Sequence, residues 1–323
     1  MIDPQEALTG RDHGGGLDAA VARWGGSREN WIDLSTGINP NPYPFSMPDS
    51  SAWAKLPDGK AYADAEAAAR SFWKIPDAAA CLLVPGLSVA IAQLPYILEG
   101  KYFFIAEPTY NEYRASFEKA GWQFERSAKT ELIVSPNNPT GTWNDPKRQK
   151  RLDYQIIDES FSDIDPERSH AARSTNSGVL ILKGLGKFWG LAGLRFGAVF
   201  GDPDIVNVLR QRLGPWAVSG PALDIAKQVL SDPMWAETTR TKLVKVASQL
   251  DQIMKPLHQS PPVGTPLFRL YTVIDAKALH LSFAQHSILT RVFPYDHKLL
   301  RMGLPANKAE FGKVLKTVAS VLK

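Results

Sequence analysis

The sequence predicts an α/β protein with a large domain on a mainly parallel sheet and a smaller α+β domain. Between residues 81 and 200, short apolar runs alternate with helix-like segments. This alternation is typical of buried strands that helices cover on both faces. After Pro215 the pattern changes to a long helical stretch followed by shorter strand-like and helix-like runs. A chain of 323 residues is long enough for a large domain and a smaller companion.

Each apolar run in the first part ends at a polar or glycine-rich turn. Strands are expected at residues 81–84, 102–106, 132–134, 155–157, 179–182 and 194–200. Helices are expected at 88–98 and 112–120. Ligands of open α/β sheets bind beyond the strand ends, so we expect functional residues in the turns that follow these strands.

The second part begins with a helix expected at 235–257, which a Pro/Gly-rich break ends. The remaining elements are a helix at 276–286 and strands at 267–273, 288–293 and 299–302. Asn307 and Glu310 fit a capping box before a last helix. The expected domains are a large one at 40–215 and a small one at 216–323, with residues 1–39 as an arm packed with the small domain and the active site.

Composition and charge narrow the class of function. Hydrophobic residues make up 44% of the chain and charged residues 22%, which is typical of a globular protein. The net charge is +4, and basic residues do not form a block or interleave with aromatic residues. A nucleic-acid partner is therefore not expected, whereas a small anionic substrate suits a mildly basic pocket.

The single cysteine and the lack of a long apolar segment indicate a cytoplasmic protein without disulfides. Cys81 lies in an apolar run and is expected to be a buried strand residue. The first residues have neither a basic nor an apolar leader segment, so a signal peptide is not expected. No apolar stretch approaches 18 residues, so a membrane helix is not expected either. No metal site is predicted.

Three segments carry chemistry. Residues 135–141 read SPNNPTG directly after an expected strand, and this turn should present the amide of Asn138 to a cleft. Residues 158–161 read DESF after the next strand, and a carboxylate buried at a strand end, here Asp158, needs a cationic partner. By themselves, the first could be an ordinary turn and the second a helix N-cap.

The third segment, residues 182–197, reads LKGLGKFWGLAGLRFG. Lys187 lies in a glycine-punctuated loop after a strand, and Arg195 follows eight residues later. A lysine nucleophile needs burial or a neighbouring cation to lower its pKa. Arg195 could supply that cation and also bind a phosphate with its planar guanidinium. The alternative is a surface loop with ordinary basic residues.

In this order, the three segments resemble the signature of fold-type-I pyridoxal-phosphate (PLP) enzymes, the aminotransferase class I/II superfamily. The resemblance implies the aspartate aminotransferase-like fold and PLP as cofactor. It implies that Lys187 forms the Schiff base with PLP and that Asp158 pairs with the pyridine nitrogen. It also implies that Asn138 hydrogen-bonds the ring hydroxyl and that Arg195 binds the phosphate.

Two further turns fit the same cofactor. Residues 85–88 (PGLS) open a helix, whose N-terminus is an anion site; the amides of Ser88 and Val89 would hold the phosphate. Residues 108–110 (PTY) follow a strand, and the resemblance implies that Tyr110 stacks on the pyridine ring. The alternatives are a simple helix cap and a half-buried core tyrosine.

The flanking segments resemble the L-threonine-O-3-phosphate decarboxylases of cobalamin biosynthesis, which are close to histidinol-phosphate aminotransferases. The matching segments are residues 13–16, 33–40, 214–219, 288–291 and 299–305. A substrate with a carboxylate and a phosphate needs donors for two anions, which Arg291 and Arg301 can supply. His13 could add another donor to the phosphate, and the resemblance extends the substrate site to Gly37 and Asn39.

The resemblance implies decarboxylation of L-threonine O-3-phosphate to (R)-1-amino-2-propanol O-2-phosphate by a homodimeric carboxy-lyase. Lys187 would return the proton to the Cα atom after carbon dioxide leaves. Two alternatives stay open. The first is an aminotransferase of the histidinol-phosphate type, because a fold hosts many reactions. The second is a non-catalytic interaction protein of the corrin pathway that retains the PLP fold.

The chain departs from the family pattern at several positions. Gly184 and Gly186 stand where relatives often have serines that contact the cofactor phosphate. Phe161 stands where many relatives have tyrosine, and Leu56 where a tyrosine reaches the neighbouring subunit. The region 121–157 is short, so we expect a surface helix or strand of the large domain to be missing.

Overall fold

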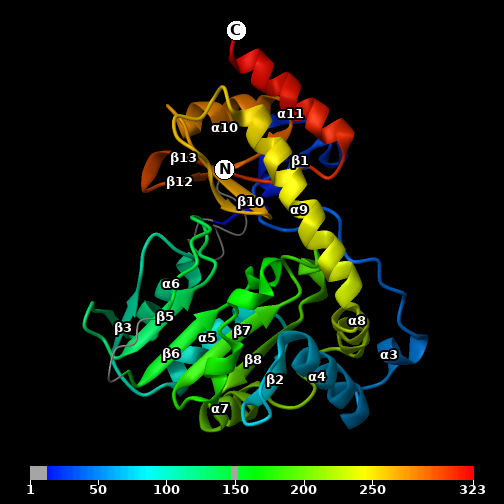
Figure 1. Ribbon diagram of the computed structural model, residues 1–323, viewed down its shortest axis with the longest axis vertical. Coiled ribbons are helices and arrows are strands. Elements are labelled where there is room, and N and C mark those ends of the chain that lie inside the picture. The colour runs from blue at the N-terminus through cyan, green and yellow to red at the C-terminus, as the bar shows by residue number, and fades with distance from the viewer. Residues whose placement is uncertain (1–12, 147–151) are drawn as a thin grey trace. The chain divides into compact units, whose positions relative to one another are not determined.

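The computed structural model describes residues 13–146 and 152–323 (Figure 1). The chain divides into two compact units: residues 42–238, and a second unit that joins residues up to 41 with 239–323. The sequence analysis set the domain boundary at Pro215. The structure groups residues 216–238 with the large unit, because α8 (Gly220–Leu230) packs along α4 (Gly59–Trp73).

The large unit is built on a seven-stranded sheet with the order β2-β8-β7-β6-β5-β3-β4. The strands from β7 to β4 are parallel, and β8 is antiparallel to both its neighbours, so the predicted mainly parallel α/β fold is confirmed. In sheet order the strands are Ala80–Val84, Gly197–Gly201, Val179–Gly184, Tyr154–Asp158, Thr130–Val134, Tyr102–Ile105 and Gln123–Phe124.

One face of this sheet is covered by α5 (Leu87–Ile97), α6 (Asn111–Lys119) and α7 (Pro203–Leu213). Successive strand residues point to opposite faces, so Leu180 and Leu182 of β7 join the core beneath these helices. Ile181, which lies between them in sequence, points to the opposite side of the sheet. That side carries the short 3₁₀ segments η2 (Ser162–Ile164), η3 (Pro166–Arg168) and η4 (Ala171–Thr175).

The connection from β5 to β6 has no helix in its described part, although a helix commonly joins neighbouring parallel strands. Its described residues, 135–146 and 152–153, include no helix or strand. The edge strand β4 is only two residues long. The described part of the β5–β6 loop therefore contributes no helix to either face of the sheet.

Most predicted elements lie where the apolar runs placed them, with one informative exception. A strand was expected at 194–200, but residues 192–194 form a 3₁₀ turn, η5, and Arg195 adopts a left-handed conformation with φ 55°. Strand β8 begins only at Gly197. The apolar run conceals this turn, which aims the Arg195 side chain. Helices α4, α7 and α8 and the short α3 (Ser50–Ala54) were not predicted.

The second unit contains a four-stranded antiparallel sheet with the order β12-β13-β10-β9. In that order the strands are Arg291–Phe293, Asp296–Gly303, Phe268–Thr272 and Val263–Thr265. Its helices are α2 (Leu17–Trp24), α10 (Ala276–Gln285), α11 (Lys308–Val321) and α9 (Pro233–Met254) from residue 239 onward. Asn307 caps α11 by accepting from the Glu310 amide.

The amino-terminal segment is part of this second unit. Strand β1 (Ile32–Asp33) pairs in parallel with β11 (Ile288–Leu289). The residues that follow β1 continue along β13, where the Gly303 amide donates to the Leu34 carbonyl at 2.7 Å. Among the described helices, none is both long and apolar enough to cross a membrane.

Candidate active site

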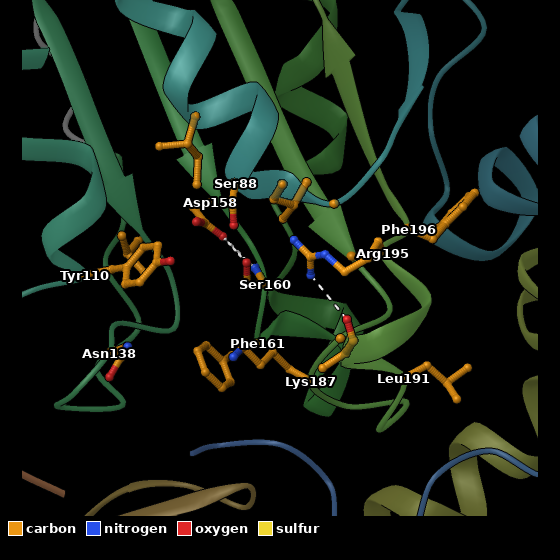
Figure 2. A pocket seen from close by; sticks show the side chains of 17 residues that line it. Ser88, Tyr110, Asn138, Asp158, Ser160, Phe161, Lys187, Leu191, Arg195 and Phe196 are labelled. Carbon is orange, nitrogen blue, oxygen red and sulfur yellow. Dashed lines mark hydrogen bonds between the residues drawn. The ribbon is translucent and has the colours of Figure 1, made fainter. Parts of the chain in front are cut away.

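A pocket in the large unit lies at the carboxyl ends of the central parallel strands (Figure 2). Strand β5 leads to Asn138, β6 ends at Asp158, and the loop after β7 carries Lys187. Six of the seven predicted cofactor residues line it: Ser88, Tyr110, Asn138, Asp158, Lys187 and Arg195. Val89, the seventh, follows Ser88 in the first turn of α5 but is not one of the lining residues.

Asp158 is a buried carboxylate, with 2% of its surface exposed. One carboxylate oxygen, Oδ1, accepts hydrogen bonds from the Ser160 amide at 2.8 Å and hydroxyl at 2.5 Å. Burial raises the pKa of Asp158, although the Ser160 and Tyr113 hydrogen bonds and the Lys187 charge act in the opposite direction. The hydrogen bonds and the Lys187 charge therefore do not fully compensate the negative charge of the buried carboxylate. A cationic ring nitrogen beside it would supply the missing positive charge.

Tyr113 of α6 is a site residue that the sequence analysis missed. Its fully buried hydroxyl donates to Asp158 Oδ2 at 3.0 Å. Burial, and then the Asp158 charge, raise the pKa of Tyr113 well above its usual value, so it stays a donor. Its closeness in sequence to Tyr110 could have revealed it, because Tyr110 is the N-cap of α6 and Tyr113 lies in the first turn of that helix. Their rings meet edge to face, with centroids 6.4 Å apart.

The two asparagines of the β5 turn have different surroundings. Asn137 is buried, and its Oδ1 accepts from Thr109 Oγ1 at 2.6 Å. Its Nδ2 donates to the Pro108 carbonyl and to Thr140 Oγ1, both at 2.9 Å. Asn137 thus ties its own turn to the loop that carries the pocket tyrosine, while its neighbour Asn138 lines the pocket.

Tyr110 and Ser88 lie together at the pocket wall. Burial raises the pKa of Tyr110 to about 12, and the charges of Glu112 and Asp158 add to this. A hydrogen bond with Ser88 acts in the opposite direction. Tyr110 therefore stays neutral and offers a flat ring next to the start of α5.

Arg195 reaches the start of α5 through two unusual backbone conformations. Gly86, which precedes α5, has φ 82°, and Arg195 has φ 55°. This φ at Gly86 lies in the region that favours glycine, and a Cβ atom there would lie 2.5 Å from a guanidinium nitrogen of Arg195. The guanidinium also donates to the Ala192 carbonyl at 3.2 Å. The helix N-terminus and the guanidinium together form an anion site.

Lys187 follows a tight glycine loop. Cβ atoms at Gly184 and Gly186 would lie 3.4 Å from the Phe196 carbonyl oxygen and the Ala192 Cα atom, respectively. These are ordinary van der Waals distances, so the backbone leaves room for a serine Cβ at either position. Lys187 Nζ lies 5.6 Å from the ring centroid of Phe161, a cation–π distance that favours the ammonium form.

The pocket fits PLP group by group. It has a carboxylate for a protonated pyridine nitrogen, an aromatic wall, an amide from Asn138, an anion site and a lysine amine. The buried Asp158 carboxylate and the Arg195 guanidinium beside the start of α5 are the two structural observations that argue for such a ligand, because the first favours a bound cation and the second a bound anion.

The predicted substrate residues lie in the second unit. Arg291 and Arg301 are direct Cα partners across β12 and β13, so their side chains share a face. Their guanidinium carbons lie 5.5 and 6.0 Å from the ring centroid of Phe293. Like charges at such a pair are destabilising unless an anion lies between them. Arg301 is buried and donates to the Ser35 carbonyl at 2.6 Å.

The predicted substrate residues near the amino terminus are organised around Ser35. A Cβ atom at Gly14 would lie 2.3 Å from the Ser35 carbonyl oxygen, and the Gly15 amide donates to Ser35 Oγ at 2.7 Å. His13 is thereby held near the residue that Arg301 contacts. Gly37 is buried, and so is Asn39, whose Oδ1 accepts from the Asn41 amide at 3.0 Å.

Replacing Asp158 with asparagine tests the charge deficit in cofactor-free protein. The raised pKa means that folded Asp158 binds a proton where the unfolded carboxyl is already ionised. Its contribution is therefore present below the ordinary Asp range and is lost as pH rises through the folded pKa. As pH rises through this range, we expect the unfolding temperature of Asp158→Asn to increase relative to that of the wild type. The exposed variant Asp153→Asn should show no such relative increase. A pH-independent difference would contradict the charge deficit.

Known proteins resemble this chain in sequence. The model of the family "Aminotransferase class I and II" matches residues 125–292. A threonine-phosphate decarboxylase of Sinorhizobium sp is 35% identical over 92% of this chain and 94% of its own length. One from Pseudomonas aeruginosa is 33% identical over 94% and 96%.

A solved structure shows the same fold. The histidinol-phosphate aminotransferase from Sinorhizobium meliloti, determined in complex with pyridoxal-5'-phosphate, superposes with a TM-score of 0.77. It covers 94% of this chain and 95% of its own, at 14% identity. PLP, the cofactor expected from the sequence, is the cofactor of this family. The chain belongs to the aminotransferase class I and II family.

Proposed function

We propose that this protein decarboxylates L-threonine O-3-phosphate to (R)-1-amino-2-propanol O-2-phosphate in cobalamin biosynthesis, with PLP as cofactor. The observation that carries the proposal is the similarity, at 33–35% identity over more than nine-tenths of the chain, to two proteins named threonine-phosphate decarboxylase. An aminotransferase of the histidinol-phosphate type is the second candidate; proteins of that name are 28–32% identical to this chain, but over only 41–53% of its length.

The pocket side chains have complementary tasks toward the cofactor. Lys187 provides the amine that holds it covalently, and Asp158 keeps a proton on the pyridine nitrogen. Asn138 donates to the ring hydroxyl, and Tyr110 packs on the ring. When bound, PLP withdraws electrons from the substrate Cα atom, so that a bond to that atom can break heterolytically.

The cofactor phosphate is bound at the start of α5. The amides of Ser88 and Val89 point out of the first helical turn, and the Ser88 hydroxyl is exposed. Arg195 adds a planar donor on the other side of Gly86. Because Gly184 and Gly186 offer no hydroxyls, these groups have a larger share of phosphate binding than in relatives with serines.

Lys187 also returns the proton to the substrate. The bond between Cα and the carboxylate carbon breaks, and the carboxylate leaves as carbon dioxide. The bonding electron pair stays at Cα, and the Lys187 ammonium protonates that atom. The neighbouring Phe161 ring favours the ammonium form that this step requires.

The paired arginines and His13 bind the two anions of the substrate. Arg291 and Arg301 offer planar donors from adjacent strands, which suit carboxylate and phosphate oxygens. The phosphate and carboxylate of threonine phosphate relieve the repulsion between the two guanidinium groups.

The decisive experiment measures carbon dioxide release by PLP-loaded protein from threonine phosphate without any keto acid. We expect the wild type to release carbon dioxide, and Lys187→Ala to lose at least about 100-fold in kcat, because it lacks the proton donor and the covalent anchor. Exposed Lys129→Ala should behave as the wild type.

Three outcomes would contradict the proposal. Wild-type rates in Lys187→Ala would exclude this lysine from catalysis. Amine transfer that requires a keto acid, without carbon dioxide, would favour the aminotransferase. If PLP addition gave no absorbance band, the protein would be a non-catalytic member of the fold.

The arginine pair gives a separate prediction. Arg291→Gln removes one of the two planar donors, so KM for threonine phosphate should rise roughly tenfold or more, with a smaller change in kcat. Lys298→Gln is the matched control, because it removes an equal charge from an exposed position on the same sheet. Equal effects of both variants on KM would indicate general electrostatics only.

We further propose that the chain works as a cytoplasmic homodimer. In the large unit, Met47, Trp53, Leu56 and Trp216 are 71%, 62%, 67% and 55% exposed. Trp53 lies on α3, which packs on α8, and Trp216 shortly precedes α8. Clustered exposed side chains of this kind are typical of subunit interfaces.

The single cysteine is a buried free thiol, as a reducing compartment allows.

Sedimentation equilibrium tests the dimer. We expect wild-type protein to sediment as a dimer and Trp53→Asp to shift toward monomer, because a charge would then be buried in the interface. Met234→Asp, which changes a 74% exposed side chain on α9, is the control and should stay dimeric. A monomeric wild type would refute the proposal.

A further inference from the structure

A buried cluster of three charged side chains lies beneath the pocket, on the sheet face opposite α5. Lys183, Glu159 and Asp163 are 2%, 1% and 4% exposed. Lys183 Nζ lies 2.9 Å from Glu159 Oε2 and 3.4 Å from Asp163 Oδ1. The two carboxylates outweigh the effect of burial and raise the pKa of Lys183, so the lysine stays charged. None of these side chains lines the pocket.

Two tryptophans complete the coordination of Asp163. The indole nitrogen of Trp189 donates to Oδ2 at 2.8 Å, and that of Trp73 donates to Oδ1 at 3.1 Å. Both rings are buried, at 0% and 3% exposure. They differ in origin, because Trp73 is the last residue of α4, whereas Trp189 lies in the loop that carries Lys187.

The cluster joins the two chain segments that position the pocket's charged groups. Glu159 directly follows Asp158 at the end of β6, and Lys183 belongs to β7, four residues before Lys187. Trp189 follows Lys187 by two residues. An ion pair between Glu159 and Lys183 thus holds the two strand ends together, and the indole fixes the return of the loop.

The Trp189 ring is also held from its other side. It stacks on Trp235 with ring centroids 5.2 Å apart and an interplanar angle of 13°. The Trp189 carbonyl accepts from the Tyr43 amide at 3.0 Å. These contacts fix the direction of the indole N–H. Its hydrogen bond then sets the position of the loop relative to Asp163.

We propose that the hydrogen bond from Trp189 to Asp163 is a positioning contact that holds Lys187 at the correct distance from Asp158. The proposal rests on the proposed function, in which these two groups bind opposite ends of PLP. A buried ion cluster is poor evidence of a stability role, because hydrophobic packing of the same volume often stabilises as well. A cluster that joins both cofactor-holding segments is better explained by placement. Small errors in such placement reduce rates strongly.

Trp189→Phe and Trp73→Phe form a matched pair that separates placement from stability. Each keeps a buried ring and removes one indole donor to Asp163, but only the first acts on the Lys187 loop. Both variants should unfold at a lower temperature than the wild type, because each removes an indole hydrogen bond to the buried Asp163 carboxylate.

Only Trp189→Phe should disturb the cofactor. We expect it to weaken PLP binding and to reduce the circular dichroism of the bound cofactor's visible band, which reports a fixed orientation. Its kcat should fall roughly 10- to 100-fold with little change in KM. Trp73→Phe should keep the wild-type dichroism, PLP affinity and kcat.

The possible failures are distinguishable. If Trp189→Phe matched Trp73→Phe in dichroism, PLP affinity and kcat, the positioning contact would be refuted while the proposed function stood. Equal loss in both variants would also refute it, because the effect would then follow the stability of the cluster. If the wild type itself showed no PLP band, the proposed function would fail first.

Discussion

The buried carboxylate of Asp158 is the constraint on which the rest of the pocket depends. It lies at the end of the central strand β6, where water cannot compensate its charge, and burial raises its pKa in spite of the Ser160 and Tyr113 hydrogen bonds. Such a group is costly unless a cation is bound beside it. The neighbouring parallel strands end at the same edge, so Asn138 and Lys187 are delivered around this carboxylate by topology alone. The pocket is therefore arranged about a cationic ring.

Anions are bound by different means in the two units. In the large unit, the phosphate site combines a helix N-terminus with Arg195, at the cost of positive φ angles at Gly86 and Arg195. In the second unit, two arginines face each other across an antiparallel pair, at the cost of repulsion. The positive φ of Arg195 and the like charges of the arginine pair are local departures from favourable structure, and such departures concentrate at functional sites.

Much of this fold followed from sequence pattern, because buried parallel strands read as short apolar runs and polar turns mark their ends. The turns after these strands, together with the family resemblance, led to six residues that line the pocket. The sequence pattern failed where the determinant is a contact across the fold. Tyr113 and Asn137 act through partners 45 and 28 or 29 positions away, and the turn before Arg195 is hidden in an apolar run. The substrate residues came from resemblance, since no local pattern marks an arginine pair across two strands.

The glycines at positions 184 and 186 connect these observations. They remove two hydroxyls from the phosphate site, and they also leave the lysine loop without side chains that could anchor it on the pocket side. Cβ atoms at these positions would make ordinary van der Waals contacts at 3.4 Å, so the loop has room for side chains there but carries none. Its position must then be fixed from beneath, where the Trp189 ring and indole N–H are both held. A loop simplified on the side of the cofactor thus depends on the buried charges on its other side, which explains why a costly ion cluster is retained in that place.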